Sequence, residues 1–304
     1  MQQKTQLSFP MQFACLLSLL GMGMIIGNLL ILALGANMMH VPMKEVPALL
    51  TKPGYMRFAQ LLNSLASLIV FCIPAIVLAK ILNNHPFQYL QFRSKITLKQ
   101  VLLVVLLAFT GLLLSGALGQ LNESIWLPAK WLIKAREMEN MYKETMLSMA
   151  TMHSFTDYLI ALLVMAFCPA LFEEVLFRGG FQQIFVGWTK NVLIGILITS
   201  ILFSAIHFSF FGFLPRVGLG MVLGYVFYFG RNIWLNILMH FFYNGMIVTQ
   251  LYLASIRGKN IEKTMDENMP IWWGLLAIFA VVYLLQAFKK ETTILHTANS
   301  ADVN

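Results

Sequence analysis

Long apolar segments are the feature that most constrains how this chain can fold. Eight of them reach, or come close to, the ~20 apolar residues that an α-helix needs to cross the hydrocarbon core of a bilayer. These predicted spans cover residues 13–35, 58–82, 100–121, 157–177, 191–211, 215–230, 233–254 and 270–288. We therefore predict an all-α polytopic membrane protein, built as one bundle of about eight transmembrane helices.

Composition and charge agree with a membrane location. The 304 residues are 59% hydrophobic and 11% charged, whereas a soluble domain is roughly half apolar and a quarter charged. The net charge of +8 does not indicate nucleic-acid binding, because the basic residues lie in short loops where they anchor a protein to anionic lipid headgroups. The sequence predicts an integral multi-pass protein that contacts the lipid bilayer and no nucleic acid, in the cell membrane if the chain is bacterial.

The connections carry weaker signals of topology. The longest, Asn122–Thr156, has apolar residues at helical spacing and charged residues on other faces, which is typical of an interfacial amphipathic helix and equally of a helix packed on the bundle. The connection Lys80–Lys99 holds four basic residues and no acidic one, so both termini are expected in the cytoplasm. Gly23-x-x-x-Gly27 and Gly220-x-x-x-Gly224 are either helix-packing seams or glycines without a role.

Three polar clusters interrupt the later apolar segments. The string EEVLFRG, Glu173–Gly179, closes one apolar run. His207 lies within ILFSAIHFSF, and His240 and Asn244 lie within ILMHFFYNGM. Ionisable groups at membrane depth are expensive, so they indicate function by default. Three clusters on separate hydrophobic segments predict an assembled, intramembrane polar active-site cavity.

The two glutamates of the first cluster are expected to have different tasks. Glu174 and Arg178 are four residues apart, so they share a helical face and can form an ion pair. Glu173 is rotated by about 100° from Glu174 and is then free to face a cavity, where a carboxylate can act as a general base. The alternative is a buried charge network that only fixes helix packing.

The two later clusters can complete a hydrolytic site. His207 can hold a water molecule opposite Glu173, and together they can deprotonate it. His240 and Asn244 are also four residues apart, and two aligned donors are what a developing oxyanion requires. Either cluster can instead be no more than a hydrogen bond between helices.

Metal binding and nucleophilic catalysis are competing hypotheses. Glu173, His207 and His240 are residue types that bind zinc, but no HExxH motif is present. We therefore expect no cofactor, with zinc as the alternative. The cysteines Cys15, Cys72 and Cys168 all lie in apolar segments, where a small buried residue is the ordinary interpretation rather than a nucleophile or a disulfide.

The polar clusters together resemble a known family. EEVLFRG is similar to the EExxxR motif of the type II CAAX prenyl endopeptidases, also called CPBP or Abi proteins, which are intramembrane glutamic proteases. The family's FxxxH motif is matched by Phe203-x-x-x-His207, and its HxxxN motif by His240-x-x-x-Asn244. The resemblance implies that Glu173 and His207 activate water, and that His240 and Asn244 stabilise the oxyanion.

The resemblance covers residues 158–254, about a third of the chain. With it, we expect N-terminal transmembrane helices and the interfacial helix in residues 1–156, a catalytic core in 157–254, and the last transmembrane helix with a polar tail in 255–304. The implied activity is hydrolysis of a peptide bond near the membrane surface in a peptide or protein substrate, prenylated or membrane-associated. A proton-coupled transporter, or a non-catalytic scaffold or immunity protein, is the alternative function.

Overall fold

The computed structural model describes residues 7–150, 152–259 and 270–301, and these residues form helices and turns without a strand. The α-helices are α1 (Phe9–Met39), α2 (Val46–Leu50), α3 (Met56–Ser67), α4 (Ile73–Leu82), α5 (Pro86–Tyr89), α6 (Leu98–Glu123), α7 (Ala129–Ala150), α8 (Phe155–Ala161), α9 (Cys168–Leu176), α10 (Gln183–Thr189), α11 (Val192–Ala205), α12 (Phe213–Gly230), α13 (Ile233–Ile256) and α15 (Ile271–Ala301). Short π-helical segments join α3 to α4, α8 to α9 and α9 to α10, so each of these series is continuous.

Seven of the described helices are long and apolar enough to cross a membrane. They run over Phe9–Met39, Met56–Leu82, Leu98–Glu123, Phe155–Thr189, Phe213–Gly230, Ile233–Ile256 and Ile271–Leu295. The prediction of an integral, multi-pass, all-α bundle is confirmed. The predicted span over residues 191–211 is the exception, because its helix, α11, has 14 residues and ends at Ala205.

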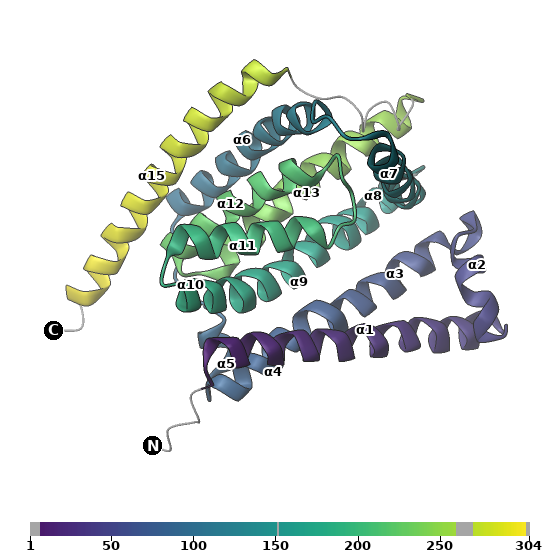
Figure 1. Ribbon diagram of the computed structural model, residues 1–304, viewed down its shortest axis with the longest axis horizontal. Helices are drawn as coiled ribbons and strands as arrows, with labels where there is room; N and C mark the ends of the chain where they lie inside the picture. The colour runs from purple at the N-terminus through teal and green to yellow at the C-terminus, as the bar shows by residue number, and fades with distance from the viewer. Residues whose placement is uncertain (1–6, 151, 260–269, 302–304) are drawn as a thin grey trace.

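The helices form a bundle around α12 and α13 (Figure 1). Helix α6 packs on α12, α13 and α15, while α11 packs on α10 and α12. Helices α1, α3 and α4 pack together along one side, where α9 and the π-helical turn between α3 and α4 join them to the rest. The start of α1 and the end of α15 lie at the same end of the molecule (Figure 1).

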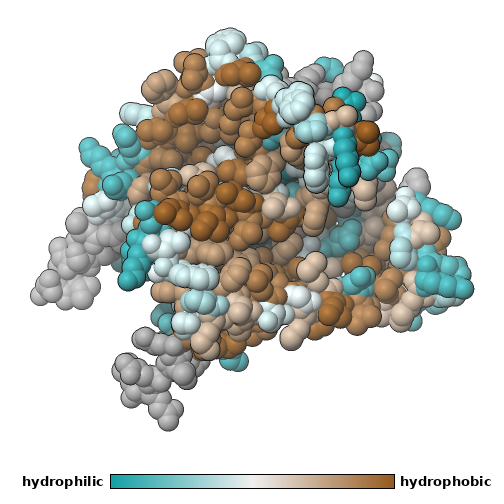
Figure 2. Space-filling model, viewed as in Figure 1, coloured by the Kyte–Doolittle hydropathy of each residue, from teal (hydrophilic) through white to brown (hydrophobic). Residues whose placement is uncertain are grey.

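The outer surface carries the apolar side chains that a membrane protein presents to lipid. Figure 2 shows a broad hydrophobic area across the middle of one face, with hydrophilic groups toward its edges. Exposed large side chains include Ile25 on α1, Leu98 on α6 and Phe279 on α15, the last with 73% of its surface accessible. Such exposure is costly in water and favourable in hydrocarbon, which is consistent with a location in the bilayer.

Helix α7 covers the end of the bundle nearest the turn after α11. Two of the α7 residues on its predicted apolar face contact the bundle. Ala135 is buried, and the ring of Tyr142 lies under the guanidinium of Arg216 on α12. On another face, Glu139 accepts a hydrogen bond of 2.8 Å from the Ser209 hydroxyl. The helix therefore packs on the bundle, as one of the two alternatives for this connection predicts.

Both glycine pairs lie at close helix contacts. A Cβ at Gly23 would lie 2.9 Å from the carbonyl oxygen of Ile69. A Cβ at Gly220 on α12 would lie 2.9 Å from the Cβ and 3.0 Å from the Cα of Ser200 on α11. Because these partner atoms belong to the backbone or lie next to it, they cannot move without the helix, and the predicted packing seams are confirmed.

We expect Gly220→Ala to destabilise the protein by about 1–3 kcal/mol, the usual cost of overpacking a close contact. The added methyl would force α12 away from α11. Gly21→Ala on α1 is the matched control, because a Cβ there meets nothing within 4 Å. Thermal unfolding of the two purified variants in detergent measures the difference. Equal melting temperatures for the two variants would show that the seam tolerates a side chain.

Candidate active site

The two adjacent glutamates lie on α9, directly before a π-helical segment. That segment, Phe177–Gln182, is buried over its whole length, and π-helical turns often occur at functional sites. The Glu174 side chain is 0% exposed, whereas the Glu173 side chain is 13% exposed. Adjacent positions on this helix therefore place one carboxylate inside the bundle and the other at the edge of accessible space.

Glu174 is the centre of a buried polar network. Its Oε2 atom lies 3.2 Å from Nε of Arg178, so the predicted ion pair is confirmed. Its Oε1 atom accepts a hydrogen bond of 2.9 Å from Nδ1 of His240, and Oε2 also accepts one of 3.3 Å from the Asn236 amide. One carboxylate thus holds a cation on its own helix and two side chains of α13, which fixes the position of α13 against α9.

Arg178 connects the same network to α12. Its Nη2 atom donates a hydrogen bond of 3.2 Å to the carbonyl oxygen of Gly220. One turn later, Gln182 donates one of 2.9 Å to the carbonyl oxygen of Gly224. The guanidinium also lies 5.1 Å from the ring centre of Phe203. Because Gly220 and Gly224 have no side chains, the two donors can approach the α12 backbone directly.

His240 lies between the two carboxylates. A carboxylate only accepts hydrogen bonds, so Nδ1 must carry the proton in its contact with Glu174. The opposite ring nitrogen, Nε2, lies 3.9 Å from Oε2 of Glu173. Glu174 therefore orients the His240 ring so that its free nitrogen faces the region beside Glu173.

His207 does not lie on a transmembrane helix, and in this respect the prediction is wrong. Helix α11 ends at Ala205, and Phe208 adopts a left-handed backbone conformation with φ of 50°. His207 therefore occupies the turn that follows α11. Its Nδ1 atom lies 2.8 Å from the carbonyl oxygen of Phe203. Since a carbonyl only accepts, Nδ1 donates, and Nε2 of the neutral ring is left with a lone pair that can take a proton.

Phe203 joins the two histidines. Its ring is 1% exposed, lies 5.2 Å from the His207 ring and 5.8 Å from the His240 ring, and meets each of them edge-on. Four-residue spacing places the Phe203 carbonyl under His207 and the Phe203 ring beside it. The spacing Phe-x-x-x-His thus supplies both a hydrogen-bond acceptor and an apolar wall.

The predicted site residues are not all in mutual contact. Glu173, Glu174, Arg178 and His240 form one cluster, to which His207 is connected only through Phe203. Within the described residues, neither a hydrogen bond nor an ion pair joins His207 to Glu173. Asn244 is half-buried one turn after His240, and its amide makes no hydrogen bond to the part of the chain that the structure describes.

Two residues that contribute to the site did not stand out in the sequence: Gln182 and Asn236. Both had a detectable signal. Asn236 lies four residues before His240, and Gln182 lies four residues after Arg178, so each extends the polar face of its helix by one turn. Asn236 is fully buried and also donates a hydrogen bond of 2.7 Å to the Leu223 carbonyl on α12.

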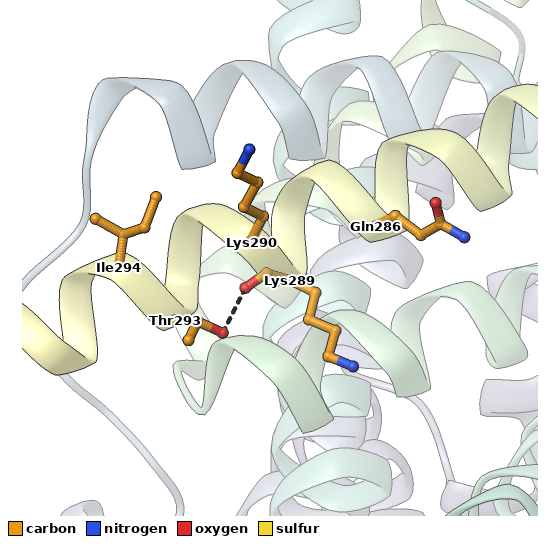
Figure 3. Close-up of a pocket in the computed structure, with 5 residues that line it drawn as sticks. All are labelled: Gln286, Lys289, Lys290, Thr293 and Ile294. Carbon is orange, nitrogen blue, oxygen red and sulfur yellow. Dashed lines mark hydrogen bonds between the residues drawn. The ribbon is translucent and has the colours of Figure 1, made fainter.

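A cavity of about 360 Å³ lies between α7 and the turn that carries His207. It is lined by Leu127, Trp131, Lys134, Ala135, Met138, Ser204, Ala205, Phe208, Ser209, Phe210 and Phe213. A second hollow lies on α15 near Lys289 and Lys290, where Thr293 donates a hydrogen bond to the Lys289 carbonyl (Figure 3). None of the six predicted site residues lines either hollow, but Ala205 and Phe208, which line the first, lie on both sides of His207 in the chain.

The zinc alternative has no ready-made ligand set in the described residues. Over residues 7–150, 152–259 and 270–301, no three His, Cys, Asp or Glu side chains are grouped so that they can hold a metal ion. The three proposed ligands, Glu173, His207 and His240, are among the residues searched. A zinc site made of these three would require them to move together.

Comparison with known proteins identifies the part of the chain that carries this site. Residues 155–246 match the family model described as type II CAAX prenyl endopeptidase Rce1-like. No curated protein and no solved structure matches the chain. The matched residues include all six predicted site residues, the helices α9, α11 and α12, and the first part of α13, up to residue 246. Over residues 155–246, the chain is thus similar to the Rce1-like type II CAAX prenyl endopeptidases, the family that its three motifs resemble.

Proposed function

We propose that the protein is an intramembrane endopeptidase in which Glu173 and His207 activate water for attack on a peptide bond. The family implies a protease that takes a protein or peptide substrate in the membrane. The observation that carries the proposal is the difference between the two glutamates. Glu174 contacts Arg178, His240 and Asn236, whereas Glu173 has, among the described residues, only the Nε2 atom of His240 within ion-pair distance, 3.9 Å away.

The proposed reaction needs a base, a proton carrier and an oxyanion site. Glu173 removes a proton from water, and the water oxygen forms a bond with the peptide carbonyl carbon. His240 supports the negative charge on the carbonyl oxygen: with Nδ1 held by Glu174, its Nε2 is a donor in the imidazolium form. The Asn244 amide, which makes no hydrogen bond to another described residue, is a second donor. The proton that Glu173 has taken from water then passes to Nε2 of His207, and His207 delivers it to the leaving amine as the carbon–nitrogen bond breaks, so that Glu173 and His207 return to their starting forms.

A prenylated substrate is the finer part of the proposal. The cavity beside His207 has a mainly apolar lining that includes Trp131, Met138 and Phe210. Apolar cavities of this size accept apolar groups of small-molecule dimensions. A lipid-modified peptide could place its hydrocarbon there while its backbone reaches Glu173.

We expect His207→Ala to lower the rate of peptide cleavage by roughly 10²–10⁴-fold, the usual contribution of a positioned acid or base. The test uses full-length protein in detergent and quenched fluorogenic peptides, with and without a farnesylated CAAX end. His85→Ala is the matched control, because His85 is exposed and lies outside the site. Wild-type rates in His207→Ala would remove His207 from the mechanism, and faster cleavage of the unmodified peptide would remove the prenyl preference.

A further inference from the structure

Arg216 is a half-buried cation under α7 that has no counter-ion among the described residues. It lies in the first turn of α12 and is half-buried. No carboxylate of the described residues lies within 4 Å of its guanidinium, and its Nη1 atom is enclosed without a hydrogen-bond acceptor. An unpaired charge in apolar surroundings is costly, so a side chain held in this way favours the binding of an anion.

Neighbouring residues hold the guanidinium in one place. It lies over the face of Tyr142 on α7, with 4.8 Å from its central carbon to the ring centre. It also packs directly on Gly212, where any Cβ would overlap the guanidinium atoms. Tyr142 and Gly212 thus form two walls of a slot that keeps Arg216 turned inward, and α7 supplies one of these walls.

The slot lies beside the turn that carries His207, because Gly212, on which the guanidinium packs, is the last residue of that turn before α12. Within the described residues, Arg216 forms no ion pair with Glu173. A base must keep its lone pair to accept a proton, so a cation that directly paired with Glu173 would oppose catalysis. The positive end of the α12 dipole lies at the same place and adds to the attraction for an anion.

We propose that Arg216 anchors a carboxylate of the peptide substrate, and that this carboxylate is the free C-terminus. The guanidinium fork binds carboxylates through two parallel hydrogen bonds. This inference rests on the proposed endopeptidase function, and it names the substrate feature that the site selects. A peptide carboxylate that approaches Glu173 without such a cation would be repelled, so Arg216 both attracts the substrate terminus and compensates its charge.

The test measures binding separately from cleavage. Full-length Glu173→Gln protein in detergent is titrated with one farnesylated CAAX peptide in three forms: a C-terminal acid, a C-terminal amide, and an amide whose last residue is aspartate. With Arg216 intact, we expect the acid to bind about 10- to 100-fold more tightly than the plain amide, as for a charge-assisted hydrogen bond. The aspartate form distinguishes a terminal carboxylate from a side-chain carboxylate. If it binds as tightly as the C-terminal acid, then Arg216 does not select the free C-terminus.

Second substitutions then assign the preference to Arg216. Arg216→Gln should reduce the ratio of acid to amide affinity to about 1, and Arg216→Lys should keep part of it. Arg257→Gln removes the same charge from an exposed position at the end of α13 and should leave the ratio unchanged. An unchanged ratio in Arg216→Gln, equal binding of acid and amide, or no binding of either peptide would overturn the proposal.

Cleavage by the protein with Glu173 intact separates the two proposals. Since the anchor binds the substrate before and during reaction, Arg216→Gln should raise KM for the acid about 10- to 100-fold and change kcat little. Cleavage without any preference for the acid would leave the endopeptidase standing and remove the anchor. Acid-selective binding without cleavage would leave the carboxylate anchor standing and remove the endopeptidase function.

Discussion

Glu173→Gln should abolish peptide hydrolysis and leave the protein folded. The amide has almost the same shape as the carboxylate but cannot accept a proton from water, so the rate should fall by at least roughly 10²–10⁴-fold. Stability should change little, because Glu173 is partly exposed and the nearest ring nitrogen of His240 is 3.9 Å away. The loss of activity and the retention of stability are both needed, since a misfolded variant would also be inactive.

The matched control for this substitution is Glu137→Gln on α7. Glu137 is exposed and lies outside the site, so it undergoes the same chemical change without touching the proposed base. Peptide cleavage and thermal unfolding would be measured on wild type and on both variants. Glu173→Gln protein that cleaves at the wild-type rate would exclude Glu173 as the base.

We expect Glu174→Ala protein to unfold at a markedly lower temperature than wild type. Removing one partner of a buried ion pair leaves the other charge uncompensated and typically costs about 3–5 kcal/mol. Here Arg178, with a side chain that is 1% exposed, would lose its carboxylate. His240 and Asn236 would lose their acceptor as well, so the contact between α9 and α13 would also weaken.

A double substitution tests the origin of this loss. Glu174→Ala combined with Arg178→Met removes the stranded charge, so we expect it to be more stable than Glu174→Ala alone. Thermal unfolding of the two variants and wild type in the same detergent gives the comparison. If the double variant is the least stable of the three, then Arg178 stabilises the protein by contacts other than the ion pair, such as those with Gly220 and Phe203.

The length of the apolar segments was sufficient to predict the membrane bundle, and helical periodicity was sufficient to predict contacts within a single helix. Apolar length predicted the spans, because a helix in lipid satisfies its own backbone groups. The pairing of Glu174 with Arg178 followed from four-residue spacing, which depends only on helix geometry. These features are local, so no knowledge of the neighbouring helices was needed.

Features that depend on tertiary contacts could not be predicted in this way. The end of α11 at Ala205 is invisible in hydropathy, because the following residues 206–214 remain mostly apolar. Glu174 contacts both Arg178 and His240, and its contact with His240 depends on how α9 packs against α13. Arg216 lies in the predicted span 215–230 and has no role that spacing alone predicts, because its contact with Tyr142 depends on how α7 packs against α12.

Cleavage of peptides by the purified protein in the presence of a zinc chelator tests the central claim most directly. The assay would use full-length wild type in detergent, the farnesylated and unmodified quenched peptides, and Glu173→Gln as the blank. We expect wild type to retain its full rate in excess chelator while the blank stays silent. Loss of cleavage with chelator and its return with added zinc would contradict water activation by Glu173 and His207, and would make Glu173, His207 and His240 metal ligands.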